Sequence, residues 1–162
     1  MTTTRSIWLR AALLYLLLLN GSVGMWATFA PRSFYEDFPG GGRMWVSGDG
    51  PFNEHLVRDV GAWALGMTVV LAAAAWTLQR PLVLTAGAAA TVLALPHAIY
   101  HARHTEVIGS TADQVLSVGG LFLAVAVGAA VLALSAGPGG LQAARGRTPA
   151  SGPTRGGAAP GR

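Results

Sequence analysis

The chain has 162 residues, of which 52% are hydrophobic and 11% charged, and its mean hydropathy is +0.46. An ordinary soluble domain has about 25% charged residues, so this composition excludes that class and indicates a small integral membrane protein. The formal net charge of +4 comes from arginines scattered over loops and termini, without the basic stripe typical of nucleic-acid binding. Cysteine and lysine are absent, which excludes disulfides, thiolate chemistry and Schiff-base catalysis.

Four apolar segments follow one another, and each is long enough to cross a hydrocarbon core of about 30 Å as a helix. None alternates with a period of two, and lipid cannot satisfy unpaired backbone groups, so helices are the expected spanning structure. The sequence predicts an all-α fold: a four-helix transmembrane bundle in residues 1–136, with helices at about residues 7–30, 53–79, 81–101 and 111–136.

The first apolar segment has a second interpretation. Arg5 and Arg10 precede a leucine-rich run, and residues 22–24 (Ser-Val-Gly) resemble a small-residue cleavage site, as in a secretory signal peptide. The apolar stretch continues through Trp26 and Phe29, however, which is longer than the apolar region of a typical signal peptide. A retained helix is therefore favoured.

A long loop of about 22 residues, from 31 to 52, follows this segment. Long loops in compact bundles tend to be functional, and residues 44–46 (Met-Trp-Val) are apolar enough to fold down over a polar rim. Ser33 and Glu36 have the spacing of a capping box, which predicts a short helix at the membrane surface. Its aromatic residues are expected in the interface: Phe34, Tyr35 and Phe38.

Capping residues also mark the other helix starts. Asn53 is a good N-cap for the second segment. Pro81 suits the first turn of the third segment and makes Arg80 the middle of a very tight hairpin. Thr111 with Gln114 three residues later predicts a capping box for the fourth segment.

The distribution of charge predicts the orientation. One side of the bundle carries only arginines: Arg5, Arg10, Arg80, Arg145, Arg147, Arg155 and Arg162. The other side carries four arginines and all seven acids, a formal charge of −3. The positive-inside rule therefore predicts a multi-pass protein of the plasma (inner) membrane with both termini cytoplasmic. Residues 137–162, rich in Gly, Pro, Ala and Arg, are predicted to be a disordered cytoplasmic tail.

All four histidines lie on the acidic side. His97, His101 and His104 are spaced i, i+4 and i+7 and share one face of the third helix. The second helix offers two ion pairs at i, i+4 spacing: Glu54 with Arg58, and His55 with Asp59. Because antiparallel neighbours lie level at equal distances from their hairpin, Asp59 is expected at the level of His101.

This candidate polar cluster suggests several roles. His97, His101 and Asp59 form a candidate ligand set for a divalent metal. The zincin motif is absent, because Ala98 rather than glutamate follows His97, and haem ligation is unsupported because the histidines gather at one rim. Glu54 and Arg58 are best explained as a structural pair and His104 as part of a solvated loop. Asp59 and His97 lie about a turn inside apolar segments, where ionisable groups are either paired or functional.

Three segments carry a family resemblance: PRSFYEDFP at 31–39, GPFNEHLVRDVG at 50–61 and PHAIYHARH at 96–104. With them, residues 7–136 resemble small four-helix integral membrane proteins of high-GC bacteria that have no assigned activity. In architecture alone the chain is similar to DoxX-like membrane proteins. The resemblance implies the fold and the location, and it implies no activity.

Three classes of function therefore stay open. The favoured one is a non-enzymatic protein whose polar rim orders the outer loop and binds a ligand or partner. The second is a membrane enzyme or metal-binding protein that uses His97, His101 and Asp59. The third is a small transporter subunit, which is disfavoured because the inner halves of the helices lack ionisable groups. The protein is expected to lie in the lipid bilayer. The small residues Gly120, Ala124 and Gly128 are spaced for close helix packing, which could occur within the bundle, in a homo-oligomer or with a membrane partner.

Overall fold

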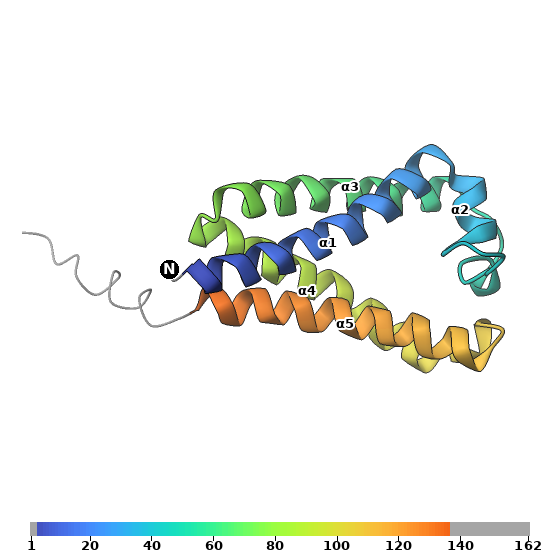
Figure 1. The fold of residues 1–162 in the computed structure, drawn as a ribbon. Helices are drawn as coiled ribbons and strands as arrows, with labels where there is room; N and C mark the ends of the chain where they lie inside the picture. The colour runs from blue at the N-terminus through green and yellow to red at the C-terminus, as the bar shows by residue number, and fades with distance from the viewer. Residues whose placement is uncertain (1–2, 137–162) are drawn as a thin grey trace, which may run out of the picture.

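The computed structural model describes residues 3–136 and shows five α-helices joined by short connections and one longer loop (Figure 1). Four helices are long and apolar enough to cross a membrane, and the described residues contain no strand. The all-α prediction is confirmed, and the predicted tail lies outside the described residues. The helices are α1 (Thr3–Phe29), α2 (Pro31–Asp37), α3 (Glu54–Thr77), α4 (Arg80–Arg103) and α5 (Thr111–Ser135). Two 3-10 turns are η1 (Ser47–Asp49) and η2 (Thr105–Val107).

α3 and α4 begin as the sequence predicts. The Asn53 side chain caps α3 by accepting a hydrogen bond of 3.1 Å from the Leu56 backbone N–H. α3 ends at Leu78, which adopts the left-handed conformation with φ of 51°. α4 starts only two residues later with Pro81 in its first turn, so the hairpin is as tight as expected.

The start of α5 differs from the predicted capping box by one residue. Ser110 rather than Thr111 is the N-cap, and its hydroxyl accepts a hydrogen bond of 3.1 Å from the Asp113 backbone N–H. The hydroxyl also donates to the Asp113 carboxylate at 2.8 Å. Gln114 donates to the backbone carbonyl of Ile108 instead of closing a box. Ser110 and Asp113 therefore satisfy the start of this helix between them.

The short helix α2 exists, but the capping box predicted for it is wrong. The helix begins at Pro31, and no side chain caps it. Glu36 pairs with Arg32 across one turn, at 2.5 Å, rather than with Ser33. Phe34 is 6% exposed because α2 folds back onto α1 and α3, so this aromatic side chain belongs to the core and not to the membrane surface.

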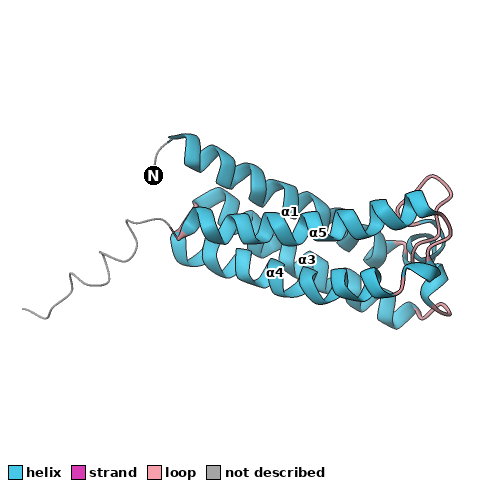
Figure 2. Cartoon of the chain, turned by 90° about the horizontal axis from the view of Figure 1, so that it is seen from below, coloured by secondary structure: helices cyan, strands magenta, loops and turns pink. Residues whose placement is uncertain are grey.

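The four long helices run along the length of the bundle (Figure 2) and pack as two pairs, α1 with α3 and α4 with α5 (Figure 1). Glycines allow each close approach. A Cβ atom added to Gly61 in α3 would lie 2.6 Å from the backbone nitrogen of Thr28 in α1. One added to Gly128 in α5 would lie 2.5 Å from the Thr91 hydroxyl in α4. Each pair thus contains a close contact between helices that a larger residue would block.

Two of the three small residues that form the predicted stripe of α5 pack inside the chain. Ala124 and Gly128 are buried, and Gly128 contacts α4. Gly120 is exposed, and a Cβ added there would meet no atom within 4 Å. Ala124 and Gly128 therefore contribute to packing within the chain, and Gly120 does not.

The two pairs meet at only one end of the bundle, which we call the arginine end because Arg5 and Arg80 lie there. The main core at this end takes residues from all four long helices: Leu9, Leu13, Leu16, Leu71, Ala74, Ala75, Val83, Ala86, Ala90, Ala124 and Val131. At the opposite end, which we call the acidic end, a second cluster of Ala27, Phe34 and Val57 joins only α1, α2 and α3. The pairs therefore diverge from the arginine end toward the acidic end (Figure 1).

Two arginines complete the arginine end. The guanidinium of Arg80 donates to the backbone carbonyl of Ser135 at 3.0 Å, and that of Arg5 donates to the carbonyl of Leu134. The last carbonyls of a helix have no partner within the helix, and cations near them are favourable. These arginines thus link α1 and α4 to the end of α5. This structural role is separate from the orientation in the membrane that the arginines predict.

Candidate ligand site at the acidic end

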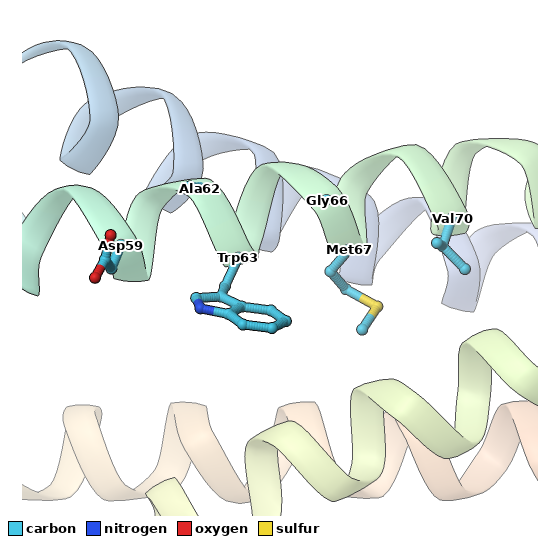
Figure 3. Close-up of a pocket in the computed structure, with 6 residues that line it drawn as sticks. All are labelled: Asp59, Ala62, Trp63, Gly66, Met67 and Val70. Carbon is cyan, nitrogen blue, oxygen red and sulfur yellow. The ribbon is translucent and has the colours of Figure 1, made fainter.

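A cleft of about 400 Å³ lies on the side of α3 that faces α4 and α5 (Figure 3). Its lining residues are Asp59, Ala62, Trp63, Gly66, Met67 and Val70. Apart from the Asp59 carboxylate and the indole N–H of Trp63, the side chains of this wall are apolar. The cleft exists because the two pairs diverge and leave this face of α3 uncovered.

Helical periodicity explains why these residues line the cleft. Asp59, Trp63 and Val70 are spaced i, i+4 and i+11, which places them on one face. The opposite face carries Gly61 and Ala64, which are buried in the α1–α3 pair. The sequence of α3 thus encodes one face for close packing and another for the cleft.

The histidines of α4 lie on the face that turns toward the other helix pair. Closer to the arginine end, this face carries Ala86 and Ala90, which belong to the four-helix core. His97 and His101 continue the stripe at helical spacing, and their rings lie 4.8 Å apart. His104 stacks on Tyr100 with 4.3 Å between ring centroids. The predicted stripe therefore forms a pair of adjacent imidazoles plus a third one that packs on tyrosine.

The carboxylate that contacts α4 beside this stripe is Asp49, in η1 of the long loop. It accepts a hydrogen bond of 3.0 Å from the hydroxyl of Tyr100, whose ring packs edge-on against that of His101. Periodicity addresses only helices, so it could not place a loop residue. In the sequence, the one indication for Asp49 was that it belongs to the seven acids predicted to lie on the same side of the membrane.

Of the two neighbours expected for Asp59, His55 and His101, the structure shows the contact with His55. Its carboxylate lies 3.4 Å from the imidazole of His55, one turn earlier in α3, as the spacing predicted. Within residues 3–136, no three His, Asp or Glu side chains are arranged to hold a metal ion. His97, His101 and Asp59 therefore do not form the expected ligand set, because the diverging pairs separate α3 from α4 at this end.

The remaining predicted pair is structural. Glu54 accepts a hydrogen bond of 2.8 Å from Arg58, and Arg58 also donates to the backbone carbonyl of Thr28 in α1. Arg58 thus links the start of α3 to the end of α1. One polar atom of the cluster stands out: His101 Nδ1 is buried and has no hydrogen-bond partner.

The loop between α2 and α3 connects the two helix pairs at the acidic end, and we call residues 38–52 the strap. Arg43 forms an ion pair of 2.7 Å with Asp113 at the start of α5. Asp49 accepts from Tyr100 of α4, as described above. Gly48 lies so close to the carbonyl of Val107, in η2, that an added Cβ would clash with it. The strap bridges the open ends of the two pairs.

The prediction that residues 44–46 fold inward holds for two of the three. Trp45 and Val46 are half-buried, and Trp45 packs edge-on against Phe38 with 6.2 Å between ring centroids. Met44 is 64% exposed. Phe38 in turn packs against Phe34 of α2 with 4.8 Å between ring centroids, so the strap is held by aromatic contacts on its own side as well as by polar contacts across the gap.

Comparisons with known proteins assign no role to these residues. No protein-family model, curated protein or solved structure matches the chain. The function must therefore be inferred from the cleft, the strap and the polar groups around them.

Proposed function

We propose that this multi-pass membrane protein binds a small amphipathic molecule in the cleft along α3, on the side that faces the α4–α5 pair (Figure 3). Ligand sites are concave and mostly apolar, with a few polar groups that fix orientation, and helix bundles build them between helices. The cleft has this composition. The observation that carries the proposal is Asp59, an ionisable side chain that lines an apolar cleft five residues inside a spanning helix.

The cleft is closed on one side and open on the other. Toward the arginine end, the four-helix core with Leu71 and Val83 fills the space between the pairs. Toward the acidic end, the strap crosses between the pairs and leaves a rim of polar groups. An amphipathic molecule would place its apolar part between the helices and its polar part at this rim.

Photo-crosslinking with an uncharged probe tests this proposal. We expect a 12-carbon alcohol with a mid-chain diazirine to label Trp63 and Met67, and excess unlabelled dodecanol to suppress that labelling. Trp76, which is 85% exposed, would be labelled as a lipid-facing residue without suppression. Labelling of the cleft that no excess of dodecanol reduces would contradict a binding site.

Two glycine variants sharpen this measurement. A Cβ added to Gly66, in the cleft, or to Gly119, on α5, would meet no atom within 4 Å. Gly66→Phe should therefore fill the cleft and reduce suppressible labelling about tenfold, a loss of about 1.4 kcal/mol of binding free energy. Gly119→Phe adds the same side chain outside the cleft and should leave labelling unchanged.

We further propose that the protein lies in the plasma (inner) membrane with the arginine end cytoplasmic, which places both termini in the cytoplasm. We infer that the first helix is retained, because Leu9, Leu13 and Leu16 belong to the main core.

Cysteine labelling in intact cells tests the orientation, and the natural sequence has no cysteine to interfere. Glu106→Cys, at the acidic end, should react with a membrane-impermeant maleimide. Gln79→Cys, in the α3–α4 hairpin, should react only after the cells are permeabilised. The reverse pattern would invert the proposed topology.

A further inference from the structure

The carboxylate of Asp59 has little positive charge near it. Its side chain is 51% exposed, and its recorded ion-pair partner is His55, whose side chain is 88% exposed. Within residues 3–136, no arginine forms an ion pair with Asp59. A carboxylate inside a spanning helix is costly without a cationic partner. Asp59 is thus an anionic group that a ligand could neutralise.

Three of the four arginines at the acidic end form ion pairs with carboxylates other than that of Asp59. Arg32 pairs with a glutamate in α2, Arg43 with Asp113 across the strap, and Arg58 with Glu54 in α3. Four arginines face seven acids at this end, which leaves a formal charge of −3. The field around the cleft therefore favours cations and opposes anions.

Trp63 adds a second feature that points to a cation. It lies one turn from Asp59 on the same face, and both side chains project from α3 into the cleft (Figure 3). The indole is uncovered by other parts of the chain, since Trp63 is 77% exposed. The face of an indole attracts ammonium groups, most strongly where water is excluded. A carboxylate beside an open indole is suited to an amine or a quaternary ammonium.

The dimensions of the wall suit one hydrocarbon chain. Asp59 and Val70 are eleven residues apart, which corresponds to about 16 Å along a helix. This is roughly half of a hydrocarbon core of ~30 Å. A chain bound below Asp59 would therefore span about one leaflet before it reached the four-helix core. Met67 and Val70 would contact its apolar end.

Building on the proposed cleft function, we propose that the ligand is a cationic amphiphile: a single hydrocarbon chain that carries an amine or quaternary ammonium, held by Asp59 and Trp63. Anionic and uncharged amphiphiles of equal chain length bind less tightly. The carboxylate selects the charge, the indole covers the cation, and the apolar wall binds the chain.

Competition against the diazirine alcohol tests this selectivity. The competitors are dodecyltrimethylammonium, dodecanol and dodecanoate, which share one chain length and differ in charge. The ammonium should displace the probe from Trp63 and Met67 at about tenfold lower concentration than dodecanol, corresponding to about 1.4 kcal/mol. Dodecanoate should be the weakest of the three.

Variants separate a specific contact from the general negative field. Asp59→Asn should bring the ammonium within about twofold of dodecanol while dodecanol itself competes as before. Glu106→Gln removes one negative charge from an exposed residue at the same end and should preserve the preference. Trp63→Leu should weaken the ammonium more than it weakens dodecanol, because it removes the indole and keeps an apolar side chain.

The outcomes distinguish the two proposals. Equal competition by all three compounds, or an ammonium preference that survives Asp59→Asn, would overturn the cationic ligand and leave the cleft function standing. If none of the three suppresses labelling, the cleft function itself fails, and the cationic ligand with it.

Discussion

Replacing Gly61 with alanine is expected to lower the free energy of unfolding of the bundle by about 1–3 kcal/mol, the usual cost of overpacking a tight contact. The added methyl group would lie 2.6 Å from the Thr28 nitrogen and 3.0 Å from the Ala27 carbonyl carbon, both backbone atoms of α1. A backbone cannot turn aside as a side chain can, so α1 and α3 must move apart. The contacts of Ala27 and Val57 in the second cluster would loosen as a result.

Thermal unfolding in detergent measures this effect, and Gly66→Ala is the matched control. Gly66 lies in the same helix, and a Cβ there meets no atom within 4 Å. That change should be neutral or stabilising by up to about 1 kcal/mol, because alanine is the better helix former. Equal unfolding temperatures for Gly61→Ala and Gly66→Ala would show that the α1–α3 contact does not limit stability.

Local features of this structure could be predicted from the sequence. The four long helices, the Asn53 cap and the two ion pairs of α3 depend on residues within one or two turns of each other. Their geometry follows from the repeat of the helix alone. For the same reason Asp59 and His97 were correctly expected inside their helices, although α4 extends to Arg103 and His97 therefore lies nearly two turns from its end.

The arrangement between helices could not be predicted in the same way. The hairpin register placed Asp59 at the level of His101, since it assumes that the antiparallel helices α3 and α4 stay side by side along their length. Gly61 and Gly128 instead allow α3 to pack closely against α1 and α5 against α4, so the hairpin helices α3 and α4 separate beyond their shared core. A one-residue difference between Ser110 and Thr111 at the α5 cap likewise reflects competition between two similar hydroxyl side chains.

Asp49 illustrates the same limit in a loop. Its contact with Tyr100 joins residues 51 positions apart and depends on the path of the whole strap. Each polar contact of the strap is partly exposed, and such ion pairs contribute about 0–1 kcal/mol. The strap is therefore a weak link between two strongly packed pairs, and the cleft lies behind it.

Replacing Gly48 with alanine is expected to release the strap from the α4–α5 pair. The new methyl group would clash with the carbonyl of Val107, so the strap would have to retreat by on the order of 1 Å to restore van der Waals distance. Asp49 is the next residue, and its hydrogen bond to Tyr100 would be lost with this retreat. The two pairs would then be free to separate further at the acidic end.

Spin labels on cysteines at positions 55 and 103 measure this opening, because His55 and Arg103 are exposed and lie on opposite sides of the gap. The label-to-label distance distribution should become longer and broader with Gly48→Ala. Gly109→Ala changes the facing connection, where a Cβ meets no atom within 4 Å, and should leave the distribution unchanged. If Gly48→Ala also leaves it unchanged, the α3–α4 hairpin and the four-helix core alone set the width of the cleft. A change confined to Gly48→Ala would instead make the strap the element that controls entry to the Asp59 and Trp63 site.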